Sequence, residues 1–334
     1  MDKNRIGHKI TFKERLTSIL SSGEASSLIT VSVALLSLML VFTLTSPYFL
    51  TINNLLNIGL YAAIMGTIAC SMTFINVSGN FDISGGVQIA VVAMVAAVML
   101  KAGSSVLLVI PVCLLVGTFI GYFNGFIVTV FKLEPFIATL ASMQMLRGFA
   151  YLISDGQSIV ISDVTFKFIG RGYIFGKIPI TFCIMIVCYL IYFYIGKYTI
   201  FGRTIYMIGG NRKASFLSGI KVSKTVRILY AMNGLMAGIS GIMLAAQNGA
   251  GLPMACANTN MEALSAVVLG GAGLAGGRGT IVGTFLGVFV LCVLNNGMTM
   301  LNVQSFWQQV IIGAVLLLSI SLDAVKGGNL KRKV

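Results

Sequence analysis

Long apolar runs separated by short polar connections make up most of the 334-residue chain. A membrane-spanning α-helix needs roughly 20 consecutive apolar residues, and ten runs reach or approach that length. They occupy residues 28–46, 56–77, 83–100, 105–131, 136–153, 178–195, 228–247, 262–275, 280–298 and 306–322. The runs are continuous, whereas the strands of a membrane barrel alternate. The pattern therefore predicts an all-α, polytopic membrane protein with about ten transmembrane helices.

The eighth run, 262–275, is short and rich in glycine, so we expect it to be broken or re-entrant. No polar stretch is long enough to fold alone. We therefore expect one transmembrane domain over residues 28–322, with a hydrophilic tail at 1–27 and a basic tail at 323–334. The first apolar run lacks a small-residue cleavage site, which favours an uncleaved helix over a signal peptide.

The distribution of charge predicts how the chain lies in the membrane. The net charge of +14 would also suit a protein that binds nucleic acid. Here, however, the lysines and arginines flank apolar runs, as the positive-inside rule describes for membrane proteins. Ten spans with a cytoplasmic N-terminus place most of these basic residues in the cytoplasm. We therefore expect cytoplasmic N- and C-termini and no nucleic-acid partner.

The longest polar break in the chain, residues 196–227, carries seven lysines and arginines and no acidic residue. This excess of positive charge predicts a cytoplasmic loop. We expect Gly209 and Gly210 to give it a flexible start, Asn211 to cap a short helix and Gly219 to end that helix.

That short helix suits docking into another protein, because it presents a small apolar face at helical spacing. The face consists of Ala214, Leu217 and Ser218. We interpret the loop as the place where the protein receives its energy. The coupling residues that we expect are Gly209, Gly210, Asn211, Arg212, Ala214, Leu217, Ser218 and Gly219.

Polar side chains within or between apolar runs are functional candidates, because burying them in lipid is costly. Glycines flank Asp82, which favours a gate or a water-lined cavity there. For Glu134 and Arg147 a boundary group or an interhelical hydrogen bond is the simpler interpretation. Most other intramembrane polar residues are neutral, which suits a polyhydroxylated solute better than an ion. The candidates for the pathway or its gate are Asn76, Asp82, Ser84, Glu262, Asn295 and Asn296.

A weak internal repeat divides the chain into two halves. The segment GTFIG at 117–121 recurs as GTFLG at 283–287, and an Asn-Gly pair follows each copy. The offset spans five expected helices, so the two halves would be inverted in the membrane, as in many transporters. Convergence on GxxxG helix packing explains the same pattern, and both interpretations stay open.

The sequence lacks the motifs of several common classes of enzyme site, including dinucleotide-binding, P-loop and metal sites. The segment GAGLAG at 271–276 matches GxGxxG, but no βαβ unit surrounds it and no acidic residue follows about 20 positions later. A P-loop motif does not occur, so any ATP must bind to a separate subunit. His8 is the only histidine and no CxxC pair is present. We therefore expect no catalytic residues, no metal site, no cofactor and no enzyme activity.

Several stretches resemble the ribose-type, monosaccharide permease subunits of bacterial ABC importers. The most specific are GGN at 209–211 with LSGI at 217–220, and LAGGRGTIVG at 274–283. The segments YFLTINNL at 48–55 and PFIATL at 135–140 extend the resemblance over nearly the whole chain.

This resemblance implies a sugar permease in the bacterial inner membrane. It implies ABC ATPase subunits that bind at residues 209–220, and a periplasmic or lipid-anchored sugar-binding protein that delivers the cargo. It also implies a second permease chain, either identical or closely related.

Two segments depart from the family's pattern, and both lie near the expected pathway. Gly85 replaces a valine of the family, and residues 256–262 keep only one acidic residue, Glu262. Ribose or a similar monosaccharide is the expected cargo, and a nucleoside, a signalling furanose or a branched-chain amino acid are alternatives. An ion-coupled secondary transporter is a further alternative, although no paired intramembrane proton relay is evident.

Overall fold

The computed structural model describes residues 23–256 and 258–326, and this part of the chain is mainly helical. The expectations for the terminal tails therefore fall largely outside the described residues.

A helix lies at each of the ten expected runs. These helices are α2 (Gly23–Thr45), α3 (Ile52–Val77), α4 (Gly85–Lys101), α5 (Val106–Val130), α6 (Pro135–Leu152), α8 (Ile180–Tyr198), α11 (Val222–Asn248), α12 (Thr259–Leu269), α13 (Ile281–Met300) and α14 (Ser305–Lys326).

Among the described residues, six of these helices are long and apolar enough to cross a membrane: α2, α3, α5, α8, α11 and α13. Helix α4 is apolar but has only 17 residues. Helix α12 has 11 residues, which at a rise of 1.5 Å per residue gives about 16 Å, roughly half the thickness of the hydrocarbon layer. A membrane protein of many helices is confirmed, whereas ten crossings and a broken or re-entrant eighth segment stay predictions.

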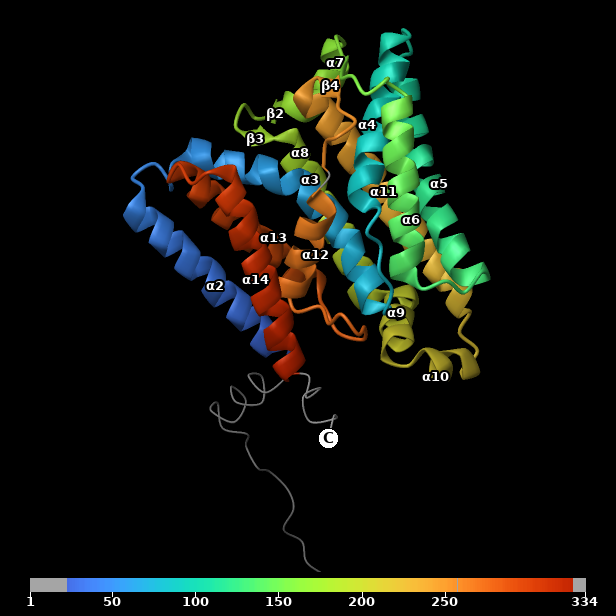
Figure 1. Ribbon diagram of the computed structural model, residues 1–334. Coiled ribbons are helices and arrows are strands. Elements are labelled where there is room, and N and C mark those ends of the chain that lie inside the picture. The colour runs from blue at the N-terminus through green and yellow to red at the C-terminus, as the bar shows by residue number, and fades with distance from the viewer. Residues whose placement is uncertain (1–22, 257, 327–334) are drawn as a thin grey trace, which may run out of the picture.

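Three further helices lie in the connections: α7 (Val164–Arg171), α9 (Ile200–Gly210) and α10 (Arg212–Leu217). Four strands of two residues each are the only departure from an all-α fold in the described part of the chain. Strand β1 (Ile159–Val160) pairs with β4 (Ala250–Gly251), and β2 (Tyr173–Ile174) pairs with β3 (Ile178–Pro179), both antiparallel. Figure 1 shows α7 and β4 at one end of the molecule and α9 and α10 at the opposite end.

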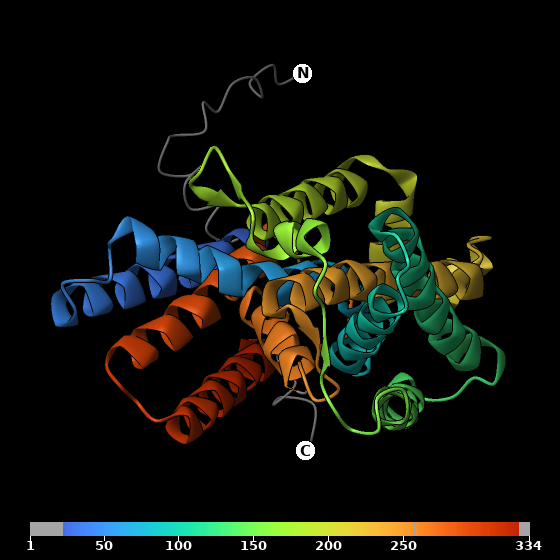
Figure 2. The ribbon, with the colours of Figure 1, turned by 90° about the horizontal axis from the view of Figure 1, so that it is seen from above.

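Helices α3 and α11 form the centre of the molecule. Most of α3 and of α11 is buried, whereas α2, α5 and α8 expose long apolar faces. Figure 2 shows α11 crossing the middle of the molecule, with α5 running across it. Exposed leucine and phenylalanine side chains on the outer helices are what a lipid-facing surface requires.

Both copies of the GxxxG segment lie at helix–helix contacts. A Cβ atom on Gly117 or Gly121 of α5 would collide with the backbone around Gly234 of α11. On α13, Gly283 and Gly287 approach the backbone of α12 and of Gly270 just beyond it in the same way. Close packing through small residues accounts for both copies, and an inverted relation between the two halves stays a prediction.

Candidate functional sites

A cavity of about 420 Å³ lies between α3, α11 and the start of α12. This volume is within the range of small-molecule sites. Tyr61, Gln247, Asn258 and Glu262 supply polar groups around it, and Met65 and Leu244 supply apolar surface. The cavity lies toward the end of the molecule that carries α7 and β4, because Arg171 of α7 donates hydrogen bonds to the carbonyl oxygens of Gln247 and Asn248.

Two of the predicted pathway residues lie at or beside this cavity. Glu262 lines it directly. A narrower hollow shares Tyr61, Met65 and Glu262 with the cavity and is also lined by Asn295 of α13. The structure therefore brings Glu262 and Asn295 together, although 33 positions separate them in the sequence.

Asp82 lies instead in a buried polar network between α3 and α4. One carboxylate oxygen accepts hydrogen bonds from the backbone N–H and the hydroxyl of Ser84, and the other accepts from Nδ2 of Asn233 at 2.9 Å. Asn233 belongs to α11, and its own Oδ1 accepts from the hydroxyl of Ser71 at 2.6 Å. The carboxyl group accepts all three of these hydrogen bonds. Asp82 thus links α3, α4 and α11.

Ser84 extends this network toward α5. Its hydroxyl oxygen accepts hydrogen bonds from Nε2 of Gln88 at 2.7 Å and from Nδ2 of Asn124 at 2.9 Å. The amide oxygens of Gln88 and Asn124 have no hydrogen-bond partner in the described part of the chain. Asp82 and Ser84 are not among the residues that line the 420 Å³ cavity. Their position favours a structural or gating role over direct contact with a solute in that cavity.

The remaining two predicted pathway residues lie apart from the cavity and from each other. Asn76, near the end of α3, is 1% exposed, and neither polar atom of its side chain has a partner among the described residues. Asn296 of α13 exchanges two hydrogen bonds of 2.9 Å with Asn54 of α3. This reciprocal amide pair joins α3 to α13.

The predicted coupling helix is present as α10. The side chain of Asn211 accepts a hydrogen bond of 2.9 Å from the N–H of Ala214, so Asn211 caps the helix as expected. Gly219 has a φ of 85°, in the left-handed region that suits the end of a helix. Phe216 and Leu217 are 69% and 75% exposed. The helix therefore presents a larger apolar surface than the small face expected from the sequence.

The expectation that Gly209 and Gly210 form a flexible start was wrong. Both glycines belong to α9, which ends at Gly210. Gly209 packs backbone against backbone, because a Cβ atom there would collide with the carbonyl oxygen of Val77 and the amide nitrogen of Gly277. The N–H of Gly277 donates to the Val77 carbonyl at 2.8 Å. We call this contact of Val77, Gly209 and Gly277 the glycine junction.

The glycine junction joins three segments that are distant in the sequence. Val77 ends α3, Gly209 lies in the last turn of α9, and Gly277 lies in the loop between α12 and α13. The hydroxyl of Tyr206 strengthens the same contact by donating to the carbonyl of Gly279 at 2.8 Å. Helix α10 is therefore connected, through α9, to α3 and to the glycine-rich loop.

Sequence reasoning missed several residues at these sites. Tyr61 and Gln247 lie within apolar runs, and the rule that selected Asn295 would also have selected them. Asn233 was also missed. Apart from Ser84, it is the only described residue whose side chain bonds to the Asp82 carboxylate. Its partner is 151 positions away, and no local pattern signals that contact.

Residues 54–320 match the protein family described as "Branched-chain amino acid transport system / permease component". The ribose import permease protein RbsC of Bacillus subtilis is 38% identical over 86% of this chain and 90% of its own length. RbsC of Escherichia coli strain K12 is 36% identical over 88% and 92%. The L-arabinose transport system permease protein AraH of the same strain is 35% identical over 84% and 85%. No solved structure matches the chain significantly.

Proposed function

Because the chain belongs to the family of "Branched-chain amino acid transport system / permease component" proteins, we propose that it is the membrane-spanning permease subunit of an ATP-driven importer for ribose or a similar monosaccharide. The observation that carries this proposal is the similarity, over most of the chain, to permeases named for ribose and L-arabinose. A sugar is thereby favoured over a nucleoside, a signalling furanose or a branched-chain amino acid. Membership of a permease family also favours transport over catalysis.

A permease of this class works with other subunits. ABC ATPase subunits supply the energy, and an external binding protein, periplasmic or lipid-anchored, supplies the sugar. We further propose that a second permease chain, identical or closely related, completes the transporter in the lipid bilayer. The chain would cross the bacterial inner membrane ten times, with the eighth crossing made by α12 together with the glycine-rich loop that follows it, and with both termini in the cytoplasm.

The polar cavity between α3, α11 and α12 is our candidate for the outer part of the sugar pathway. Its phenol, amide and carboxylate groups can exchange hydrogen bonds with the hydroxyl groups of a sugar. Helix α7 contacts the end of α11 beside the cavity and offers a surface where the binding protein would dock. Glu262 and Asn295 are the residues that we expect to touch the sugar.

The opposite end of the molecule would bind the ATPase. Helix α10 exposes Phe216 and Leu217 next to the basic residues Arg212 and Lys213. Closure of the ATPase pair would displace α10, and the glycine junction would pass the displacement to α3. Helix α3 carries Tyr61 and Met65 at the cavity and Val77 at the junction, so it connects the two ends directly.

The docking proposal is tested with Leu217→Arg. The side chain is 75% exposed, so the substitution should spare folding while placing a charge in an apolar contact. We expect loss of ATPase co-purification and at least tenfold slower ribose uptake. Replacing an apolar residue at the centre of a protein–protein interface commonly weakens binding by that much. Val164→Arg is the matched control for ATPase co-purification alone, because Val164 is 78% exposed at the start of α7, at the opposite end, where the binding protein and not the ATPase would dock.

Unchanged co-purification and uptake in Leu217→Arg would contradict docking at α10. The energy source has a separate test in cells that carry the unmodified transporter. Uptake that survives ATP depletion but stops with an uncoupler would overturn the ATP-driven importer and favour an ion-coupled secondary transporter.

A further inference from the structure

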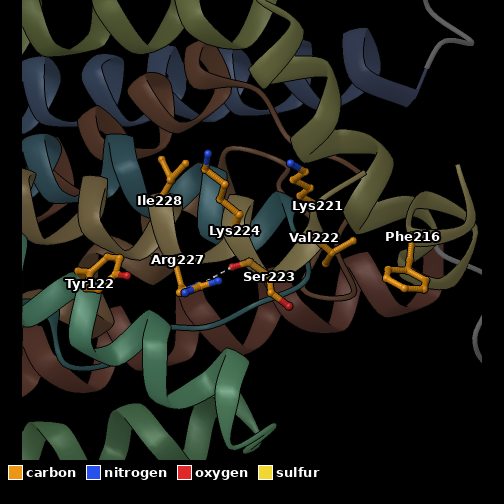
Figure 3. Close-up of a pocket in the computed structure, with 8 residues that line it drawn as sticks. All are labelled: Tyr122, Phe216, Lys221, Val222, Ser223, Lys224, Arg227 and Ile228. Atoms are coloured by element: carbon orange, nitrogen blue, oxygen red, sulfur yellow. Dashed lines mark hydrogen bonds between the residues drawn. The ribbon is translucent and has the colours of Figure 1, made fainter. Parts of the chain in front are cut away.

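A basic groove of about 520 Å³ lies between α5, α10 and the first turns of α11. Figure 3 shows Lys221, Lys224 and Arg227 along the start of α11, with Tyr122 of α5 at one end of the groove and Phe216 of α10 at the other. No acidic side chain is among the described residues that line it.

Lys224 and Arg227 are three residues apart on α11 and are therefore neighbours on its surface, and Lys221 directly precedes the helix. Like charges this close repel each other, and an anion beside them would relieve that repulsion. Nε of Arg227 donates a hydrogen bond of 3.2 Å to the carbonyl of Ser223, which leaves the two terminal amino groups for other acceptors. The groove is therefore built to attract a compact anion such as a phosphate group.

Helix α5, which contributes Tyr122 to the groove, also carries an exposed apolar ridge. Leu115, Phe119 and Phe123 are 68%, 68% and 46% exposed, and they are spaced four residues apart on one face of the helix. Both α5 and α11 are long and apolar enough to cross a membrane, so this ridge would lie at the depth of acyl chains. A soluble anion would use the cations but not the ridge, whereas a phospholipid would use both.

We propose that the groove binds the phosphate headgroup of an anionic phospholipid, whose acyl chains lie along the α5 ridge. Lys221, Lys224 and Arg227 hold the headgroup. Tyr122 lies between headgroup and chains, at the level where tyrosine side chains are favoured in membranes. The lipid would stabilise the start of α11, the helix that leads from α10 to the cavity.

The test measures lipid binding to the full-length chain in detergent by native mass spectrometry, with phosphatidylglycerol as the probe and phosphatidylcholine as the neutral comparison. The variant Lys224→Gln/Arg227→Gln removes two of the three cations. We expect phosphatidylglycerol affinity to fall roughly thirtyfold. Each lysine or arginine near an anionic lipid surface strengthens binding by about fivefold, and the variant removes two of them. Phosphatidylcholine binding should not change.

The matched control is Lys197→Gln/Arg203→Gln, which removes two cations from the same polar break outside the groove. The proposal predicts wild-type affinity for phosphatidylglycerol in this control and an unchanged unfolding temperature in both variants. An equal loss in both variants would overturn the site in favour of general surface charge. If the unfolding temperature of the groove variant falls, the single variant Lys224→Gln replaces it, and wild-type affinity there would overturn the site.

Three competition outcomes would also overturn the proposal. Displacement of phosphatidylglycerol by millimolar inorganic phosphate would assign the groove to a free anion. Displacement by purified ATPase subunit would assign it to the ATPase interface, and displacement on dimerisation would assign it to a second copy of the chain. Retention of phosphatidylglycerol in all three competitions would support the lipid site.

Discussion

Asp82 shows how a single charged residue is accommodated in this molecule. Its carboxylate is 2% exposed, and Ser84 and Asn233 donate the hydrogen bonds that compensate its burial. The sequence indicated that Asp82 is unusual, because flanking glycines isolate it from both helices. It did not indicate Asn233, since one asparagine in a long apolar run carries no pattern that identifies a distant partner.

The neighbours Asn295 and Asn296 should behave differently when each is replaced by alanine. Asn296→Ala leaves the amide oxygen of the buried Asn54 without its partner, which costs about 1–3 kcal/mol of stability. Asn295→Ala removes a group from the narrow hollow beside the cavity and should impair uptake with little change in stability. Thermal unfolding in detergent and sugar uptake distinguish the two. Equal destabilisation by both variants would contradict the assignment.

The two glycines at the end of α9 provide a second matched pair. Gly209→Ala would force apart Val77 and Gly277 at the glycine junction, whereas a Cβ atom on Gly210 meets nothing within 4 Å. We expect Gly209→Ala to retain bound ATPase while uptake falls by about tenfold or more. The added methyl group would shift α9 away from α3, and small displacements of this kind can reduce activity strongly. Gly210→Ala should transport normally. The measurement is uptake normalised to co-purified ATPase.

Two results would contradict this account of the glycine junction. If Gly209→Ala transports at the wild-type rate, the junction does not transmit motion. If Gly209→Ala loses the ATPase itself, the glycine acts in docking and not in transmission.

At the scale of the elements, the lengths of the apolar runs predicted the ten long helices. The expectation for residues 196–227 was only partly right, because α9 was missed. Its residues include Gly202, Gly209 and Gly210, which weaken helix propensity when considered locally. Tertiary contact outweighs that cost, since Gly202 packs on the carbonyls at the end of α8 and Gly209 packs at the glycine junction. Contacts of this kind are not visible in a single sequence.

At the scale of the whole molecule, α3 connects two ends with different chemistry. One end carries the polar cavity and α7, and the other carries α10 and the basic groove. The charge pattern of the sequence assigned the loop that carries α10 to the cytoplasm, and that assignment stays a prediction. It did not reveal the cavity, because α3, α11 and α12 contribute residues that are up to 202 positions apart, from Leu60 to Glu262.

The predicted orientation is tested by labelling cysteines in intact cells. Phe175→Cys places a thiol in the turn between β2 and β3, where the side chain is 94% exposed, and Leu217→Cys places one on α10. A membrane-impermeant maleimide should label position 175 from outside and position 217 only after permeabilisation. The six cysteines of the parent chain set the background. Labelling of position 217 in intact cells would overturn the orientation.

The glycine junction has a consequence for how such a protein can be altered. It consists of backbone atoms in contact, so its geometry does not depend on the identity of any side chain that faces the cargo. The residues around the cavity, in contrast, contribute side chains and leave the junction untouched when they change. On the proposed assignment of cavity and junction, substitutions at Tyr61, Gln247, Glu262 and Asn295 would change cargo preference without changing the contact that passes motion from α10 to α3.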